Sequence, residues 1–200
     1  MNNYLTFLGK NAEKAFRSKI STNLKNKVLN KFSQLIKKNK KKIINQNKKD
    51  IKFAKKIGLK KNLIDRLKIN NNKLDEIIES VKKIAKLNDP TDRILSKWKR
   101  PNGLIIKRVT VPIGVVAVIY ESRPNVTSDI SSLCFKSGNC VILRGGSEAY
   151  FSNKLISDLF RDALAKYNIN KNYVQFIKSR DRKLVDLILS KMENYVDVVI

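Results

Sequence analysis

The chain has 200 residues, 42% of them hydrophobic, and a formal net charge of +26. This length predicts one sizeable domain with a packed core, because such a chain can bury about 70% of its unfolded surface. The sequence has no stretch near the ~20 apolar residues that a membrane-spanning helix needs. Its first 20 residues also lack the apolar run of a secretory signal. We therefore expect a cytoplasmic protein that does not enter the membrane.

Cysteine and histidine usage excludes two kinds of site. The sequence has two cysteines, Cys134 and Cys140, and no histidine. Within these residues a zinc site and a Cys–His nucleophile pair are both excluded, and we predict no metal site. Both cysteines lie among apolar residues, so we expect reduced thiols that pack in the core.

The positive charge is concentrated in the first half of the chain. Residues 1–100 hold 29 Lys and Arg against 8 Asp and Glu, whereas residues 101–200 hold 14 against 9. In stretches such as 36–50 the lysines are mixed with Asn and Ile, a composition that an AT-rich genome produces. This favours solvated helix faces over a nucleic-acid-binding arm, which would use more Arg, Gly and aromatic residues. Nucleic-acid binding, driven by neutralisation of phosphates, is kept as an alternative.

Residues 4–88 show helical periodicity, because apolar residues recur every three or four positions. The pattern predicts a first helix up to about residue 20 and a second long helix that ends at Gly58. A short helix is predicted at 61–67, opened by its first or second residue. A further helix is predicted from a cap at Asn72 to about residue 87.

After Pro90 the pattern changes. Residues 104–111 alternate in hydrophobicity, which predicts a strand. From Gly114 onward short apolar runs and helical segments follow one another, which predicts a parallel sheet with crossover helices. The strands are predicted at 115–120, 140–143, 173–177 and 196–200, and the helices at 126–137, 147–166 and 182–190. Because the last strand lacks the turn and helix that would cover it, we expect the sheet to be incomplete at residue 200.

Arg144 follows one buried strand and precedes a glycine pair and a predicted helix. Its guanidinium could reach a phosphate there, while Gly145 and Gly146 let the backbone come close to a ligand. The alternative is a tight turn in which Ser147 caps the helix and Glu148 complements the helix dipole. The motif is not GxGxxG, so these residues do not predict a standard dinucleotide-binding fingerprint.

Asn125 follows another buried strand, at a position where loops often carry functional groups. Taken alone, it is best explained as the cap of the helix predicted to begin near Val126. Glu121, Ser122 and Arg123 precede it. They could line a ligand site, although an internal ion pair would explain Glu121 and Arg123 equally well.

Two long stretches resemble a known family. They are VPIGVVAVIYESRPNVTSD at 111–129 and KSGNCVILRGGSEA at 136–149. Both are similar, nearly residue for residue, to gamma-glutamyl phosphate reductase, a member of the aldehyde dehydrogenase superfamily. The resemblance implies an α/β, aldehyde-dehydrogenase-like fold with N-terminal helices and a Rossmann-like parallel sheet, truncated before the catalytic domain. It divides the chain into an N-terminal helical layer (1–88), a connecting strand segment (89–113) and an incomplete NADP-binding part (114–200).

The resemblance also implies an activity, namely NADPH-dependent reduction of L-glutamate 5-phosphate to L-glutamate 5-semialdehyde and phosphate in proline biosynthesis. An enzyme thiolate attacks the acyl phosphate, and hydride from NADPH then reduces the thioester. In the family that thiolate lies well beyond residue 200, and neither Cys134 nor Cys140 matches it. The chain would then be an oxidoreductase fragment or one half of a split enzyme. An inactive cofactor-binding fragment is the first alternative, and a basic nucleic-acid-binding protein is the second.

The resemblance assigns roles to individual residues. Asn125 matches the asparagine whose amide donates to the oxyanion of the intermediate. The residues that match the cofactor-binding segment are Arg144, Gly145, Gly146, Ser147 and Glu148. Many NAD-preferring relatives have a glutamate at the position of Ser147, so Arg144 with Ser147 favours the 2′-phosphate of NADPH. The partners implied are L-glutamate 5-phosphate, further copies of the chain assembled through 104–111, and the glutamate 5-kinase of the same pathway.

Overall fold

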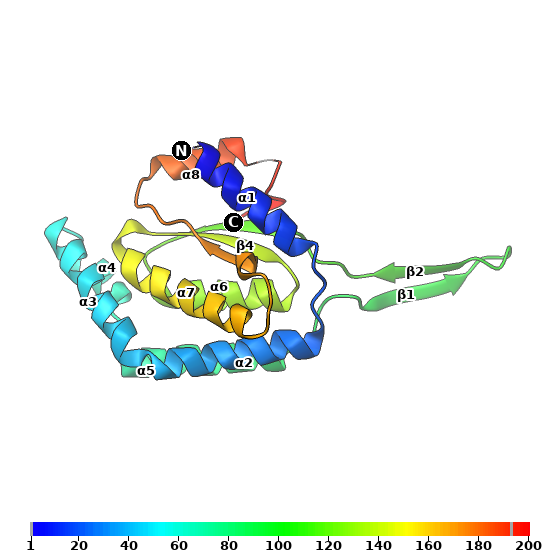
Figure 1. The fold of residues 1–200 in the computed structure, drawn as a ribbon, viewed down its shortest axis with the longest axis horizontal. Coiled ribbons are helices and arrows are strands. Elements are labelled where there is room, and N and C mark those ends of the chain that lie inside the picture. Colours follow the sequence, from blue (N-terminus) through cyan, green and yellow to red (C-terminus); the bar gives the residue numbers. More distant parts are fainter. Residues whose placement is uncertain (1, 193) are drawn as a thin grey trace.

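The structure, a computed structural model, describes residues 2–192 and 194–200. At its centre is a sheet of four parallel strands in the order β5-β4-β3-β6 (Figure 1). Their bounds are β3 Val115–Tyr120, β4 Cys140–Gly145, β5 Val174–Phe176 and β6 Val198–Val199. Apolar residues occupy most of β3 and β4 and are buried on both faces of the sheet, as expected for parallel strands covered by helices. The predicted parallel sheet is therefore confirmed.

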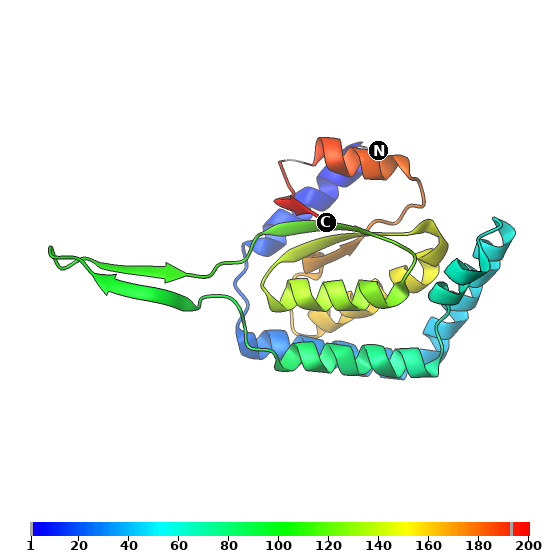
Figure 2. The same cartoon turned by 180° about the vertical axis from the view of Figure 1, so that it is seen from behind.

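Helices cover both faces of this sheet. On one face lie α6 (Pro124–Lys136) and α7 (Tyr150–Lys166), preceded by a 3₁₀ turn at Ser147–Ala149. On the other face lie α1 (Asn2–Phe16) and α8 (Lys183–Lys191), which contact each other (Figures 1 and 2). Strands and helices alternate along the chain as predicted for crossover connections, and in the sheet β3 lies between β4 and β6.

The first helix is tied to elements from the far end of the sequence. Gln175 of β5 donates a hydrogen bond from Nε2 to the carbonyl of Leu8, and the N–H of Lys178 donates to the hydroxyl of Tyr4. A Cβ on Gly9 would lie 2.5 Å from the Cβ of Tyr195, which makes this a position where only glycine fits. Helix α1 therefore packs on the sheet instead of joining the helices that follow it.

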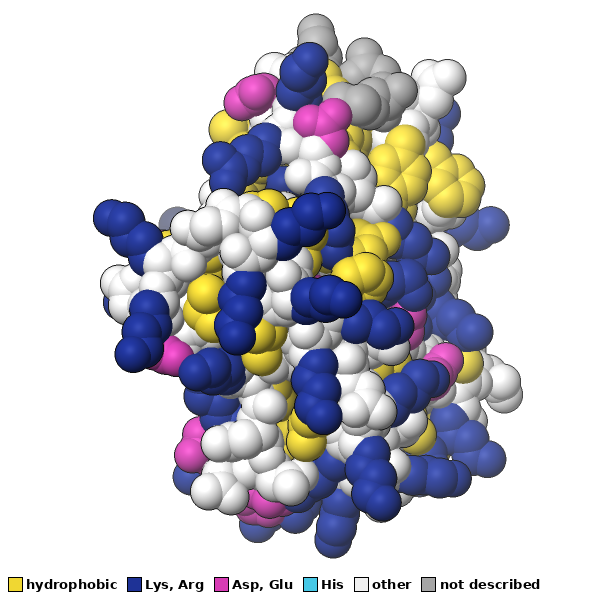
Figure 3. Space-filling view, turned by 90° about the vertical axis from the view of Figure 1, so that its left-hand side faces the viewer, with side chains coloured by type: hydrophobic (Ala, Val, Ile, Leu, Met, Phe, Trp, Pro, Cys, Tyr) yellow, Lys and Arg dark blue, Asp and Glu magenta, His cyan; other side chains and the backbone are white. Residues whose placement is uncertain are grey.

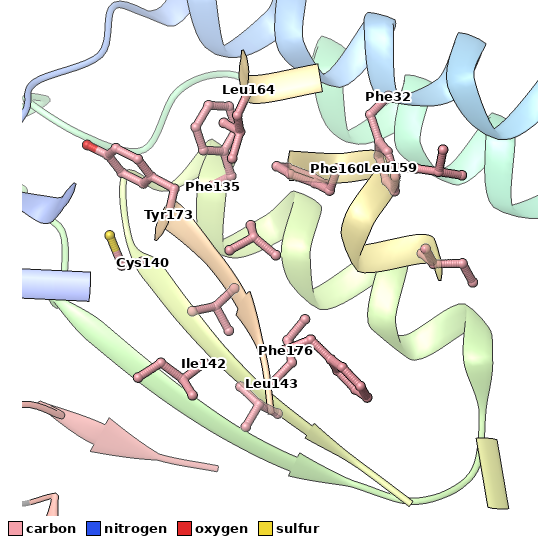
Figure 4. Close-up of a cluster of buried hydrophobic side chains, with 14 of the residues drawn as sticks. Phe32, Phe135, Cys140, Ile142, Leu143, Leu159, Phe160, Leu164, Tyr173 and Phe176 are labelled. Carbon is pink, nitrogen blue, oxygen red and sulfur yellow. The ribbon is translucent and has the colours of Figure 1, made fainter. Parts of the chain in front are cut away.

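A third layer is formed by α2 (Thr22–Lys38) and α5 (Asn71–Lys86), which pack against α7 and α6 respectively. Aromatic rings join the layers: the ring centroids of Phe32 in α2 and Phe160 in α7 are 4.6 Å apart, and Phe135 of α6 lies 5.6 Å from Phe160 (Figure 4). Each such buried side chain stabilises the fold by about 1.5–3 kcal/mol. The helices of 1–88 thus share one core with the sheet, although the three-part division of the chain remains a prediction.

The second predicted helix is in fact two helices. Asn39 ends α2, because its N–H bonds to the carbonyls of Leu35 and Ile36 and its side-chain amide donates to Leu35 at 2.8 Å. Helix α3 (Lys40–Lys56) then leaves in a new direction (Figure 1). It is followed by Gly58 in the left-handed conformation, as predicted, and by α4 (Lys61–Leu67).

The predicted cap of α5 is displaced by two residues. Asn70, and not Asn72, caps this helix, since its Oδ1 accepts the N–H of Lys73 at 2.8 Å. Asn72 lies inside the first turn. In a run of three asparagines the periodicity alone does not distinguish these positions.

The inner face of α3 holds the start of α7. The buried carboxylate of Asp50 accepts the backbone N–H groups of Phe151 at 2.9 Å and Ser152 at 2.8 Å, and the Ser152 hydroxyl at 2.6 Å. Burial raises the pKa of Asp50, although these hydrogen bonds oppose the rise. Asn47, one turn earlier, donates to the Ser152 hydroxyl and to the carbonyl of Leu67. Helix α7 is therefore capped by a neighbouring helix instead of by its own chain.

The outer faces of α3 and α4 are covered by lysine, as Figure 3 shows for the side of the molecule on which they lie. Between residues 40 and 68 the acidic residues are Asp50, which is buried, and Asp65. The exposed cations of this face are Lys41, Lys42, Lys48, Lys49, Lys52, Lys55, Lys56, Lys60, Lys61, Arg66 and Lys68. The charge excess thus lies on solvated helix faces, as the sequence pattern favoured.

Residues 94–109 form an antiparallel hairpin that projects from the body (Figure 2). Its strands are β1 (Ile94–Lys99) and β2 (Ile105–Val109). The sequence predicted β2 within 104–111 but not β1, because the ILSKWK segment does not alternate in hydrophobicity. Nearly every residue of both strands is exposed.

In the part of the chain that the structure describes, no helix is long and apolar enough to cross a membrane.

Asp89 anchors the base of the hairpin to α2. Its carboxylate accepts hydrogen bonds from Lys25 Nζ at 2.9 Å, from the Thr22 hydroxyl at 2.8 Å, and from the N–H of Thr91 at 3.0 Å. Burial acts to raise the pKa of Asp89, but these hydrogen bonds outweigh it and lower the pKa to about 2. Lys25 is itself buried, so Lys25 and Asp89 form a largely buried ion pair at the edge of the core.

We expect the Asp89→Asn substitution to destabilise the protein in a pH-dependent way. Because the pKa of Asp89 is about 2 in the folded chain against an ordinary value of 3.8, ionised Asp89 contributes about 2 kcal/mol above pH 4. This contribution is lost as the pH falls towards 2. Urea unfolding should show that the difference in free energy of unfolding between wild type and variant shrinks by about this amount as the pH falls from 6 to 2.5. Asp92→Asn, which removes an exposed carboxyl of the same segment, is the control, and a gap that stays constant with pH would contradict the assignment.

Candidate functional site

Two loops meet at the carboxyl edge of the sheet. Strand β3 ends at Tyr120, which pairs with Gly145 at the end of β4. Residues 121–123 follow the first strand and residues 146–149 follow the second, so the two segments singled out in the sequence are neighbours in space. In open parallel sheets ligands bind in the crevice outside this edge. The candidate site is therefore built where the fold favours one.

A hydrogen bond ties the two loops together. The Ser122 hydroxyl donates to Oε2 of Glu148 at 2.6 Å. Burial acts to raise the pKa of Glu148, but the hydrogen bonds from Ser122 and Ser147 and the charge of Arg182 outweigh it, so the pKa lies below its ordinary value. Glu148 is thus an ionised, largely buried carboxylate that joins the loop after β4 to the loop after β3.

Side chains of the protein itself occupy the space next to Gly145 and Gly146. A Cβ on Gly146 would lie 2.2 Å from Oγ of Ser122, and a Cβ on Gly145 would lie 2.3 Å from Nδ2 of Asn153. A side chain at either position would therefore displace a neighbouring side chain. The close approach that the sequence predicted for a phosphate is made here by Ser122 and Asn153.

Arg144 is buried beneath the loop, with 5% of its surface exposed. Its Nη1 donates to the carbonyl of Gly145, and its Nη2 donates to the carbonyl of Asp181 at 3.3 Å. Burial lowers the pKa of the guanidinium, and the nearby carboxylate of Glu148 partly offsets this. Arg144 consequently links β4 to the segment that precedes α8.

A pocket of about 430 Å³ lies between the loop after β4 and the start of α8. Four of the five residues predicted for cofactor binding line it, namely Arg144, Gly146, Ser147 and Glu148, whereas Gly145 is not a lining residue. The remaining lining residues are Arg182, Lys183, Val185 and Asp186. Three cationic residues, a serine and two acidic residues therefore line one pocket.

Sequence reasoning missed the residues that α8 and the segment before it contribute. Arg182 extends over the pocket, with its Nη2 3.8 Å from Oε1 of Glu148, and Lys183 follows it in the first turn of α8. A signal was present, because Arg182 comes a few residues after β5 and the carboxyl ends of parallel strands share one edge. The order of the strands, which decides which ends are adjacent, had to come from the structure.

Asn125 lies at the second position of α6, because Pro124 opens this helix and Arg123 precedes it. The predicted cap is therefore wrong, since the helix begins two residues earlier than expected and proline fits its first position. The Asn125 side chain is exposed, with its Nδ2 3.5 Å from Oδ2 of Asp129. It does not line the pocket beside Arg144.

The purely structural roles expected for Ser147 and for the pair Glu121 and Arg123 are not observed. Ser147 makes no capping hydrogen bond; α7 begins three residues later and is capped by Asp50. The alternative in which Ser147 caps the helix is therefore wrong. Glu121 and Arg123 form an ion pair at 3.6 Å, but both side chains are exposed, so it is not an internal pair.

Neither cysteine is suited to nucleophilic attack, which requires an accessible thiolate. Burial raises the pKa of Cys134 to about 11 and raises that of the fully buried Cys140 as well. Among the described residues no group of three His, Cys, Asp or Glu side chains could hold a metal ion.

Solved structures of aldehyde dehydrogenases share this arrangement of sheet and helices. A probable aldehyde dehydrogenase from Listeria monocytogenes matches with a TM-score of 0.69 at 12% identity, covering 98% of this chain and 41% of that chain. A propionaldehyde dehydrogenase from Clostridium phytofermentans matches equally well. At such low identity the likeness shows the fold alone. The fold is thus that of the aldehyde dehydrogenase superfamily.

Closer matches are gamma-glutamyl phosphate reductases. The structure of the one from Thermotoga maritima has a TM-score of 0.93 at 38% identity, covering 98% of this chain and 47% of that chain. The curated sequence from Petrotoga mobilis is 44% identical over 191 residues, 96% of this chain and 45% of the relative. The chain is a homologue of gamma-glutamyl phosphate reductase that matches its N-terminal portion, and it spans about half the length of these relatives. No protein-family model matches it.

We expect Gly146→Ala to destabilise the protein through a clash with Ser122. The backbone angles of Gly146, φ −53° and ψ 145°, suit alanine, so the cost should come from overpacking and amount to about 1–3 kcal/mol. Urea unfolding of Gly146→Ala, Ser122→Ala and the double variant measures this, with the two single variants as internal references. The double variant should be less destabilised than the sum of the single ones. Additive costs would show that the two positions do not meet.

Proposed function

We propose that this chain forms the NADPH-binding part of a gamma-glutamyl phosphate reductase. The reaction is reduction of L-glutamate 5-phosphate to L-glutamate 5-semialdehyde and phosphate, in the cytoplasm, on the route to L-proline. The observation that carries the proposal is the 44% identity to such an enzyme across 96% of the chain. Since the chain spans about half of its relatives, we assign the thiolate nucleophile to the half that it does not include.

The donor set of the pocket beside Arg144 supports binding of the adenosine end of NADPH. Cationic side chains complement phosphate oxygens, and Ser147 and Glu148 can bond to ribose hydroxyls. The bound cofactor would supply the hydride. The protein's own contribution would be to hold the adenosine between the loop after β4 and the first turn of α8.

Asn125 supports the chemical step in this proposal. It lies after β3 at the same carboxyl edge, and its amide is held only by a 3.5 Å contact to Asp129, so it is available to a substrate oxygen. An amide that donates to a developing oxyanion is worth about 3 kcal/mol of barrier. The Asn125 amide would orient the acyl group and stabilise charge on its oxygen.

The enzyme proposal is tested by supplying the missing half. We expect no turnover from the 200-residue chain alone, and turnover once the C-terminal half of the Thermotoga maritima relative is added. The assay follows phosphate-dependent reduction of NADP by L-glutamate 5-semialdehyde. Asn125→Ala in this mixture should lower kcat about 100-fold while leaving the Kd for NADPH unchanged.

The remaining outcomes separate the competing functions. NADPH binding without turnover in the mixture would favour an inactive cofactor-binding fragment. If the mixture showed neither NADPH binding nor turnover, the enzyme proposal would be wrong. Binding to duplex DNA that weakens steeply as salt rises would then favour a basic nucleic-acid-binding protein.

An association with glutamate 5-kinase is also proposed, because that enzyme would deliver the acyl phosphate directly.

We further propose that the chain assembles into a homo-oligomer through the hairpin β1–β2. A two-stranded hairpin is marginally stable by itself, and this one exposes large apolar side chains over its whole length. These residues are Ile94, Leu95, Trp98, Leu104, Ile105 and Val109. A covering surface on another copy would remove this apolar area from water.

We expect the Leu95→Asp and Trp98→Asp double variant to be monomeric under conditions in which the wild type is oligomeric. Charged side chains on the hairpin β1–β2 oppose its burial against another copy. The substitutions should leave the fold intact, because the hairpin projects from the body of the protein (Figure 2). Light scattering coupled to gel filtration gives the mass, and Lys97→Ala on the same strand is the control. A double variant that retains the wild-type mass would place the interface elsewhere.

A further inference from the structure

Resting on the proposed cofactor pocket, we propose that Arg182, and not Arg144, binds the 2′-phosphate and sets the preference for NADPH over NADH. Arg144 then acts as a positioning residue that holds the segment carrying Arg182. The division of roles follows from the exposure and the hydrogen bonds of the two guanidinium groups.

Arg144 is not available to an incoming phosphate. It is 5% exposed, and both of its terminal nitrogens already donate to backbone carbonyls, those of Gly145 and Asp181. Its Nε is also shielded from solvent. To reach a phosphate the guanidinium would have to give up both contacts and leave the buried carbonyl of Gly145 without this donor, which is costly. The sequence pattern places Arg144 correctly after β4 but does not reveal that its donors are used within the protein.

Arg182 is free to move onto a ligand. Its side chain is 86% exposed, and the 3.8 Å separation from Glu148 is an ion pair without a close hydrogen bond. Exposed ion pairs of this kind contribute little stability. Glu148 does not depend on Arg182 alone, because its other oxygen accepts the Ser122 hydroxyl at 2.6 Å. Arg182 can therefore exchange the carboxylate for a phosphate without leaving Glu148 unpartnered.

The segment that carries Arg182 is anchored on both sides. The guanidinium of Arg180 lies 4.2 Å from the ring centroid of Phe53 in α3 and 4.8 Å from that of Phe151 in α7, within the range of cation–π attraction. The next residue, Asp181, accepts the Arg144 guanidinium at its carbonyl and the N–H of Lys183 at its carboxylate. The backbone on either side of Arg182 is thus held, and the first turn of α8 faces Ser147 across the pocket.

Glu148 makes this arrangement selective. An ionised carboxylate next to the ribose repels a 2′-phosphate but accepts hydrogen bonds from free ribose hydroxyls. Arg182 neutralises that repulsion when it bridges the phosphate. Without Arg182 the same pocket should favour NADH, so the residue acts on the choice between cofactors and not on cofactor affinity in general.

The experiment measures Kd for NADPH and NADH by titration calorimetry on the full 200-residue chain. Adenosine 2′,5′-bisphosphate and 5′-AMP serve as probes of the adenosine end alone. We expect Arg182→Gln to weaken NADPH and the bisphosphate roughly 10- to 100-fold, the range for a lost charge-assisted hydrogen bond. NADH and AMP should stay within about twofold. Arg182→Lys should restore part of the loss, because lysine keeps the charge but not the planar fork.

Two further variants complete the test. Lys178→Gln removes an exposed positive charge from the same segment and should leave all four dissociation constants unchanged. Arg144→Gln should weaken NADPH and NADH to a similar extent, because it displaces the segment without removing a phosphate ligand. Equal losses for both cofactors in Arg182→Gln, or loss of selectivity in Arg144→Gln alone, would overturn the assignment. A wild-type chain that binds neither cofactor would overturn the proposed pocket itself.

Discussion

The carboxylate of Asp50 is the contact on which the remainder of the structure depends. It accepts two backbone N–H groups at the start of α7, which lies directly after the loop that carries Arg144 and Glu148. The first turn of a helix leaves N–H groups without partners, and a residue of the same chain segment usually supplies the cap. Here the cap comes from α3, a hundred residues earlier. The position of the loop after β4 is therefore set by the helical layer as well as by the sheet.

The same helix explains how a highly basic sequence folds without charge repulsion in its core. The inner face of α3 carries Asn47 and Asp50, whose polar atoms are paired with backbone groups of neighbouring elements. Its lysines lie on the outer face, where water solvates them and their long stems need no defined partner. The outer positions are exposed to solvent, whereas the two inner residues have specific partners.

Elements with a regular apolar pattern could be predicted from the sequence. Strands β3 and β4 are continuous apolar runs, and α1, α2 and α5 have regular apolar faces, so their place in the chain followed from periodicity. The break at Asn39 was not predicted, although residues 37–42 are all Lys or Asn, because apolar residues at helical spacing resume at Ile43 and a polar gap of this length does not by itself mark a helix end. Strand β1 also had no signal, because its ILSKWK segment does not alternate in hydrophobicity.

The candidate site was predictable in location but not in its internal contacts. Residues after buried parallel strands lie at one edge by the rules of the fold, which brought the 121–125 and 144–148 segments together. Which donors face the pocket depends on rotamers and on distant partners. Arg144 donates inwards to the carbonyl of Asp181, and the space beside Gly146 is taken by Ser122, partners that lie more than 20 residues away in the sequence.

The packing of α1 has a consequence for how the protein is made. Tyr4 and Leu8 bond to residues 178 and 175, and Gly9 fits against Tyr195. During synthesis the first helix therefore waits for about 170 more residues, which takes roughly 10–40 s at bacterial elongation rates. Over that time its apolar face is exposed to water and to other nascent chains. Helix α1 is thus complete long before residues 175, 178 and 195, which it bonds to or packs against, and its apolar face is a surface on which a chaperone would act.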